Sequence, residues 1–247
     1  MMMRRPGLIP ALGWVILAVA CGEPQSPSTV HIATAIGEQH DGTYNLGPVA
    51  LHGSFWNSCS PYAPELEASL GENLAGLALA YNGDGSLCDT CVTLKRANGK
   101  QVTARVITTG ETVGQNDIDL SQKAFEALGG DDYPRRMTWA LVKCPNSGGS
   151  GSSPKIKYQF QTEANPYWTS LWVRGARLPL RTVEVRKNGK GSWIKLDRGT
   201  DGTLTDASGF GTTKFELRLT AYDGQVLTDS FDKFSAGAVL TSSHQFD

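Results

Sequence analysis

The sequence predicts a mainly β protein built from two modules, and three observations carry that prediction. Short runs of β-branched and aromatic residues recur along the chain, separated by turn dipeptides such as Asn98-Gly99 and Asp223-Gly224. A Gly/Ser-rich linker occupies residues 147–154. The charge changes there as well. Residues 37–146 hold 8 Lys/Arg and 13 Asp/Glu (net −5), and residues 155–247 hold 13 Lys/Arg and 10 Asp/Glu (net +3).

The first 21 residues indicate an export signal. Two arginines precede an apolar run at residues 7–20, which is too short for a transmembrane span. Ala18-Val19-Ala20 suits cleavage by signal peptidase, whereas the same run ending on Cys21 suits a bacterial lipoprotein with an acylated thiol. We therefore expect an extracellular protein, either secreted or lipid-anchored at the bacterial surface, with residues 22–36 as a flexible tether.

Five cysteines leave one over in an exported chain. If Cys21 carries lipid, Cys59, Cys88, Cys91 and Cys144 can form two disulfides. The Cys88-x-x-Cys91 spacing also occurs in zinc and redox sites. Zinc would need a second pair of ligands, which the single cysteines elsewhere do not resemble, and a redox motif would precede a helix rather than a strand. Structural disulfides are favoured, and no metal or other cofactor is expected.

The first module is expected to contain strands and little helix. An N-terminal strand includes Gly42-Thr43-Tyr44, and two short β-rich runs flank the turn at Asn98-Gly99. One helix is well defined, because Ser121 can cap it and Gly129 can end it. A second short helix is expected around residues 72–80.

The second module is expected to be all-β. Residues 215–221 alternate strictly between apolar and polar side chains, and residues 183–186 do the same. About ninety residues of this kind, with turn dipeptides at regular spacing, predict an immunoglobulin-like sandwich of two antiparallel sheets.

Asp119 is the most distinctive polar residue, directly before the predicted helix. It could act as a general acid if a cleft raised its pKa, or it could cap the turn between strand and helix; the local pattern favours capping. Glycoside cleavage normally needs a second carboxylate. Asp41, Glu111 and Asp117 are candidates, and their spacing selects none of them.

An aromatic cluster lies in "NPYWTSLWVRG", residues 165–175. On a strand, Trp168 and Trp172 share one face with Ser170 and Arg174, which mark that face as the exposed one. The indoles then either form a flat binding platform or are covered by a loop or by the first module.

Several stretches, in order and at matching distances, resemble the expansin family. They are "GTY" near the start, the Cys-x-x-Cys followed by strands, "DIDLSQKAFEALG" and "VKCP", then the aromatic pair and "VRGARLPLRTVEVRKNGKGSWIKL". The first group resembles the double-psi β-barrel that expansins share with family-45 glycoside hydrolases. The second resembles the expansin carbohydrate-binding module. The resemblance covers nearly the whole chain after the tether, and the chain is especially similar to bacterial expansin-like proteins.

The resemblance implies a fold and a function. The fold is mainly β, a double-psi β-barrel over residues 37–146 followed by an immunoglobulin-like β-sandwich over residues 155–247. The implied disulfides are Cys59–Cys88 and Cys91–Cys144. Expansins slip the contacts between cell-wall polysaccharides without hydrolysis, so the resemblance implies a wall-loosening protein that is not an enzyme.

The resemblance also implies site residues. Thr43, with its neighbour Tyr44, and Asp119 correspond to the groove of the barrel, where Asp119 matches the general acid of the hydrolases. Tyr167 and Trp168 correspond to the two leading aromatics of the cellulose-binding surface.

The sequence departs from the family pattern in both modules. Thr108 and Gly110 stand where bacterial expansins carry an aspartate and an aromatic residue, and the third aromatic of the platform falls near Asp201. Because Trp172 shares the strand parity of Trp168, we expect that it substitutes for this missing ring.

The expected partners are cellulose and other cell-wall polysaccharides. The 23 basic and 24 acidic residues nearly cancel, which argues against nucleic acid, and contact with a membrane is expected only through the lipid anchor. The protein is expected to be a monomer. Two alternatives remain: a lytic enzyme on β-glucan or on peptidoglycan, like the barrel of rare lipoprotein A, and a passive envelope adhesin.

Overall fold

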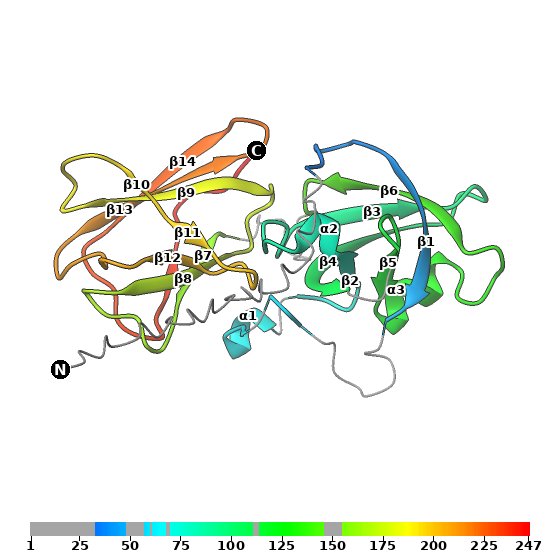
Figure 1. The fold of residues 1–247 in the computed structure, drawn as a ribbon, viewed down its shortest axis with the longest axis horizontal. Helices are drawn as coiled ribbons and strands as arrows, with labels where there is room; N and C mark the ends of the chain where they lie inside the picture. The colour runs from blue at the N-terminus through cyan, green and yellow to red at the C-terminus, as the bar shows by residue number, and fades with distance from the viewer. Residues whose placement is uncertain (1–32, 48–56, 60, 68–69, 111–113, 146–154) are drawn as a thin grey trace, which may run out of the picture.

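The computed structural model describes residues 33–47, 57–59, 61–67, 70–110, 114–145 and 155–247. The predicted export signal with Cys21, most of the predicted tether and the predicted linker lie outside the described residues. The described part forms two β modules that lie side by side (Figure 1). The mainly β fold is confirmed.

The first module is a closed six-stranded barrel with the strand order β1-β5-β2-β4-β3-β6. Strand β1 pairs in parallel with β5, and β2 with β4, whereas the other neighbours are antiparallel. In chain order its elements are β1 (His40–Leu46), α1 (Pro64–Glu67), β2 (Leu74–Ala78), α2 (Leu79–Asn82), β3 (Cys91–Lys95), β4 (Gln101–Gly110), β5 (Ile118–Leu120), α3 (Gln122–Leu128) and β6 (Arg136–Val142).

Helix α3 is the helix that the sequence predicts. Its buried side is Ala124, Phe125 and Leu128, and it ends at Gly129, whose φ of 125° disfavours any other residue. Ser121 precedes the helix, but its side chain makes no cap hydrogen bond. The Ser121 hydroxyl instead donates to the Glu72 carbonyl and accepts from the Leu74 N–H, so it ties the helix to strand β2.

The helix expected around residues 72–80 is wrong for most of its length. Residues 74–78 form strand β2, and helical structure begins only at Leu79. The strand lies between β4 and β5 and buries four of its five side chains. A run of small apolar residues buried on both faces has neither the helical nor the alternating pattern, and barrel pairing decides its conformation.

The barrel also begins earlier than expected. Ile36, assigned to the tether from sequence, forms a parallel bridge with Leu141 of β6, and Thr34 is buried with its hydroxyl 2.7 Å from His40 Nε2. The last tether residues are therefore part of the barrel.

The second module is a sandwich of two antiparallel sheets, with strand orders β10-β9-β13-β14 and β11-β12-β8-β7-β15. Its core contains the alternate residues Phe215, Leu217 and Leu219 of β13, as the strict alternation predicts. In chain order its elements are β7 (Lys157–Phe160), β8 (Thr169–Arg174), β9 (Leu180–Lys187), β10 (Ile194–Lys195), β11 (Asp197–Arg198), β12 (Leu204–Asp206), β13 (Phe215–Ala221), β14 (Val226–Phe231) and β15 (Val239–Thr241).

Two disulfides lie in the barrel module, Cys59–Cys88 and Cys91–Cys144. The pairing implied by the family resemblance is confirmed. The first bond anchors the segment before α1 to the barrel, and the second joins β3 to the end of β6.

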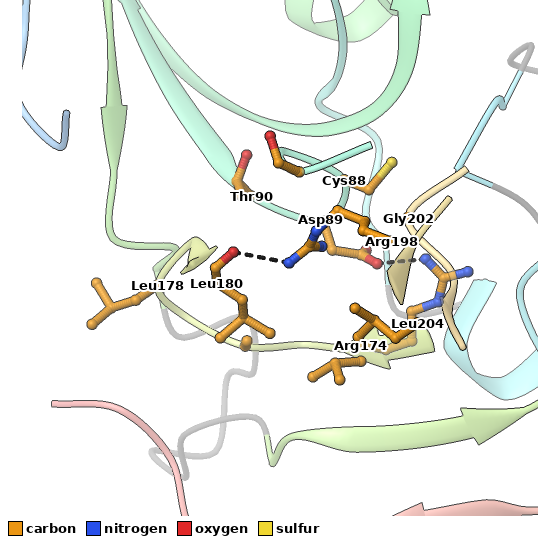
Figure 2. Close-up of a pocket in the computed structure, with 12 residues that line it drawn as sticks. Cys88, Asp89, Thr90, Arg174, Leu178, Leu180, Arg198, Gly202 and Leu204 are labelled. Carbon is orange, nitrogen blue, oxygen red and sulfur yellow. Dashed lines mark hydrogen bonds and ion pairs between the residues drawn. The ribbon is translucent and has the colours of Figure 1, made fainter. Parts of the chain in front are cut away.

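A buried ion pair joins the two modules. Arg174, at the end of β8, is 2% exposed, and its Nη1 lies 2.6 Å from Oδ2 of Asp89 in the barrel (Figure 2). Its Nη2 donates to the carbonyls of Cys59 and Pro61, at 2.8 and 2.9 Å. Because a buried guanidinium needs partners for its charge and its donors, this set of contacts favours one relative orientation of the modules.

Further contacts close the boundary between the modules. Gln159 of β7 accepts from the Ala63 N–H and donates to the Pro61 carbonyl, both at 3.1 Å. Gly85 of the barrel lies against the loop after β11, where a Cβ would approach the Gly199 carbonyl oxygen to 2.5 Å. Only glycine allows these two backbones to come so close.

Candidate functional site

A row of four residues around Asp119 lies on the face of the barrel strands that points away from the core, and three of the four are buried. Asp119 of β5 pairs with Gly76 of β2 on one side and with Asn45 of β1 on the other, and Gly76 also pairs with Thr108 of β4. Paired residues on neighbouring strands point to the same face. Thr108 and Asp119 are eleven residues apart in the chain, but they are only two strand spacings apart in the fold.

Gly76 lets the Thr108 side chain pack over the strand between Thr108 and Asp119. A Cβ at this glycine would lie 2.8 Å from Thr108 Cγ2 and 3.7 Å from Asp119 Cβ, so both side chains stand beside it on one face. We call the surface formed by Asn45, Gly76, Thr108 and Asp119 the barrel groove. Thr108, which the family resemblance assigns to the aspartate position, lies on the same face as Asp119, with Gly76 between them.

Asp119 is 7% exposed, and among the described residues no side chain or backbone group makes a hydrogen bond to its carboxyl group. Burial, and then the negative charge of Asp117, raises its pKa from 3.8 to about 6. The capping interpretation of Asp119 is wrong, because it lies inside β5 and Ser121 holds the position before the helix. The raised pKa marks Asp119 as a functional candidate.

Thr43 lies beside this row. It is two residues before Asn45 on β1, so strand alternation places both on the same face. The Thr43 N–H donates to Asp117 Oδ1 at 2.8 Å. This bond holds the carboxylate that repels a charge on Asp119.

Tyr44 was expected in the groove, and that expectation is wrong. Its ring is fully buried in the barrel core, edge-to-face with Phe125, and its hydroxyl donates to the Gly130 carbonyl. Strand alternation explains the difference, because Tyr44 pairs with the core residue Ile118 whereas its neighbours Thr43 and Asn45 point outward.

The three candidates for a second carboxylate separate in the structure. Asp41 lies four residues before Asn45 on β1, about 13 Å along a strand, and pairs with Thr138 of β6 away from the groove. Asp117 is close to Asp119 but accepts the Thr43 N–H. Glu111 lies outside the described residues.

The Thr108 hydroxyl belongs to a polar network instead of supplying a charge. It accepts from the Ser58 N–H and donates to the Ser58 hydroxyl, both at 3.3 Å. Gly110, in the family's aromatic position, pairs with Ala78 at the end of the β2–β4 ladder. Asn45, Ser58 and Gly76 were missed from sequence, and only the parity of Asn45 with Thr43 could have indicated one of them.

Tyr167 and Trp168 lie in a tight turn before β8. The Asn165 side chain accepts from both of their N–H groups, at 3.0 and 3.1 Å, and the Asn165 carbonyl accepts from the Thr169 hydroxyl. Tyr167 is 79% exposed, and Trp168 is half-buried. The turn presents both rings on a backbone fixed by its own hydrogen bonds.

Trp172 was expected to extend this aromatic surface, and that expectation is wrong. Its side chain is 3% exposed, so it offers no face for stacking. Its Nε1 donates to the Asp201 carbonyl at 3.3 Å, which places the indole beside the position of the missing third aromatic. Arg174 lies over its ring, 5.2 Å from the centroid.

The strand parity of Ser170, Trp172 and Arg174 is as predicted, but their exposure is not. All three lie on the face of β8 opposite the sandwich core, and all three are buried. The segment after Cys59 and the barrel loop at Asp89 cover this face. The first module is the cover, which was the alternative interpretation of the aromatic cluster.

Two negative results apply to the described residues only. No group of three or more His, Cys, Asp or Glu side chains is arranged to hold a metal ion. No helix in this part of the chain is long and apolar enough to cross a bilayer.

Comparisons with known proteins agree with this architecture, although no protein-family model matches the chain. Expansin-YoaJ of Bacillus subtilis is 25% identical over 226 residues, which cover 90% of this chain and 88% of the relative. Expansin-like protein 1 of Dictyostelium discoideum is 22% identical over 83% of this chain and 70% of its own length.

Solved structures show the same fold. An expansin of Clavibacter michiganensis superposes with a TM-score of 0.66 at 18% identity, over 84% of this chain and 96% of the other. A mutant of that expansin, in complex with cellohexaose, gives the same TM-score at 17% identity.

The closed barrel, the sandwich docked against it and the carboxylate of the barrel groove define a two-module β protein of the double-psi barrel class. Within that class, the chain is similar over most of its length to bacterial expansins.

Proposed function

We propose that this protein binds cellulose or a related β-glucan and loosens cell-wall contacts without cleaving the polymer. The barrel groove is the observation that carries the proposal. Of its four described residues only Asp119 carries a carboxylate, and Thr108 on the same face is neutral, whereas hydrolysis of a glycosidic bond normally uses two carboxylates.

The aromatic turn supports binding to a flat polymer. Tyr167 and Trp168 are held by Asn165 and need no enclosing pocket to meet a ligand. Aromatic rings offer apolar area to the CH faces of sugars, as they do to the faces of bases. The cellohexaose complex of the C. michiganensis expansin supports an extended glucan as the ligand.

A lytic enzyme is the second candidate, and the pKa of Asp119 favours it. A carboxyl group with a pKa of about 6 can donate a proton near neutral pH, as a general acid must. The substrate would then be β-glucan or peptidoglycan. A passive adhesin is the third candidate and uses the aromatic turn alone.

Paper weakening combined with sugar release separates the three candidates. For the full chain incubated with filter paper, we expect loss of tensile strength with no soluble reducing sugar above the heat-denatured control. Release of soluble sugars that disappears in Asp119→Asn would establish the lytic enzyme. Retention on the paper with neither weakening nor release would establish the adhesin.

Removing the aromatic turn is expected to weaken retention on cellulose. In the double variant Tyr167→Ala/Trp168→Ala, two stacked rings are lost, each of which contributes about 1–3 kcal/mol in comparable stacking sites. In a pull-down on microcrystalline cellulose, half-maximal binding of the variant should therefore require at least about tenfold more cellulose than binding of the parent.

Trp193→Ala is the matched control for that experiment. Trp193 is a half-buried indole just before β10, and the guanidinium groups of Arg186 on β9 and Arg218 on β13 lie 4.6 and 4.4 Å from its ring centroid. The substitution Trp193→Ala should leave retention on cellulose unchanged. Unchanged retention in Tyr167→Ala/Trp168→Ala would contradict the aromatic turn as the binding surface.

The site of action follows from the proposed export. We propose that the chain works outside the cell as a monomer, secreted or held by an acylated Cys21. The two disulfides of the barrel support an oxidising compartment.

A further inference from the structure

A pocket of about 330 Å³ lies at the boundary between the modules, away from the aromatic turn. Its lining comes from the segment around α1, from strand β4 of the barrel and from strands β7 and β8 of the sandwich. This volume falls within the range of small-molecule sites, about 300–1,000 Å³, which often occur between domains.

The buried carboxylate of the pocket is already engaged. Asp89 accepts from Arg174 at 2.6 Å and from the Tyr62 hydroxyl at 2.9 Å, and Arg105 lies 4.0 Å away. Burial and then the charge of Asp89 raise the pKa of Tyr62 well above its usual value, so the phenol stays neutral. Among the described residues the ion-pair partners of Asp89 are Arg174 and Arg105, and it pairs with neither lysine of the pocket.

Cations outnumber carboxylates around the pocket. Arg105, Lys155, Lys157 and Arg174 line it, against only Glu65 and Asp89. Arg105 donates one N–H to the Asp89 carbonyl, and Lys157 donates to the Thr241 hydroxyl at 2.8 Å, which leaves donors on both side chains for a ligand. The excess of positive charge favours an anion.

One donor on a residue that lines the pocket is buried without an acceptor. Nε of Arg174 has no hydrogen-bond partner among the described residues, although this side chain is only 3% exposed. An unsatisfied buried donor is costly, and native proteins contain few of them. This donor lies on a residue that lines the pocket, which is consistent with a polar ligand there.

The lining also contains apolar groups. They are Tyr62, Leu66 and Leu70, and the Arg174 guanidinium lies over the Tyr62 ring, 3.8 Å from its centroid. A lining that combines apolar groups with cationic donors suits a molecule that has a hydrophobic CH face and an anionic group. Inorganic anions lack the first property, and neutral glucans lack the second.

We propose that this pocket binds a uronic acid residue, with the sugar ring against Tyr62, Leu66 and Leu70 and the carboxylate among Arg105, Lys155 and Lys157. The site is separate from the aromatic turn and the barrel groove, and it does not depend on the function proposed above. An acidic polysaccharide bound there contacts both modules at once.

Calorimetric titration of the full chain with trigalacturonate tests this site, with cellotriose and inorganic phosphate as comparison ligands. We expect saturable binding of trigalacturonate, and much weaker binding of either comparison ligand. The double variant Lys155→Ala/Lys157→Ala should weaken trigalacturonate binding at least about tenfold. The double variant Lys190→Ala/Lys195→Ala, which removes the same charge from exposed positions at the turn before β10 and on that strand, should change it less than about twofold.

Three outcomes would overturn the proposal: no saturable binding, phosphate binding as tight as that of trigalacturonate, or equal losses in the two lysine variants. The last result would indicate attraction to the net charge of the sandwich rather than to the pocket. Retention on cellulose should be unchanged in Lys155→Ala/Lys157→Ala, and trigalacturonate binding unchanged in Tyr167→Ala/Trp168→Ala. Failure of this site is thereby distinguished from failure of cellulose binding.

Discussion

Arg174→Met is expected to lower the free energy of unfolding by about 3–5 kcal/mol, because it leaves the buried Asp89 carboxylate without its closest cation. Methionine keeps much of the side-chain volume, so the loss reports charge and hydrogen bonding more than a cavity. The backbone carbonyls of Cys59 and Pro61 lose a donor at the same time. Chemical denaturation followed by tryptophan fluorescence measures the change.

The module boundary should also open in this variant. With the ion pair removed, small-angle X-ray scattering should show a larger radius of gyration than for the parent, and thermal unfolding should split into two transitions. Arg218→Ala is the matched control, because that arginine pairs with Glu184 on the exposed face of the other sheet. Its unfolding curve should stay close to that of the parent.

Combining Arg174→Met with Asp89→Asn tests the electrostatic reason directly. Asp89 has a φ of 66°, which asparagine tolerates, so the second change removes the charge without new backbone strain. The double variant should recover part of the stability lost in Arg174→Met, because no unpaired carboxylate remains. If instead the two losses simply add, the ion pair is not what joins the modules.

The sequence could predict the elements but not the surface between the modules. The parity of residues 170–174 correctly places Trp172 and Arg174 on one face of β8. Polar neighbours then suggested that this face meets water, because an arginine is seldom fully buried without a charged partner. That partner is Asp89, eighty-five residues earlier and in the other module, and no local pattern reveals such a distant pair.

For the barrel groove, too, the sequence could predict individual residues but not how the strands bring them together. The motif around Asp119 identified the carboxylate, and counting back along the chain identified Thr108 as its neighbour in the family. The barrel pairing that joins them through Gly76 could not be read from the chain. The prediction for Tyr44 was wrong because a motif alone does not tell which of two adjacent residues on a strand points outward.

Asp119→Asn is expected to abolish paper weakening while retention on cellulose stays at the parent level. The Asp119 carboxylate lacks hydrogen-bond donors among the described residues, and glucan hydroxyls could supply them as strong charge-assisted bonds. An amide of the same shape accepts such bonds more weakly. Retention is proposed to depend on the aromatic turn in the other module, so it should not change.

The same substitution should make the protein more stable at neutral pH. The folded-state pKa of Asp119, about 6, is above its ordinary value of 3.8, so folding is favoured by the protonated form. That contribution is complete below pH 3.8 and is lost as the pH rises through about 6. At pH 8, Asp119→Asn should therefore raise the free energy of unfolding by up to about 3 kcal/mol, whereas at pH 3.5 the two proteins should be nearly equal.

The direction of the pH dependence then separates loosening from catalysis. If the carboxylate accepts glucan hydroxyls, weakening should decline as the pH falls below about 6, because the group becomes protonated. A general acid behaves in the opposite way on this limb, since its neutral form is the active one and sugar release should rise as the pH falls. A weakening profile that increases below pH 6, together with released sugar, would contradict the hydrogen-bonding role of Asp119. Burial makes the Asp119 carboxylate costly to form. The same raised pKa therefore sets the pH range in which Asp119 lowers the stability of the fold and the range in which its carboxylate can accept glucan hydroxyls.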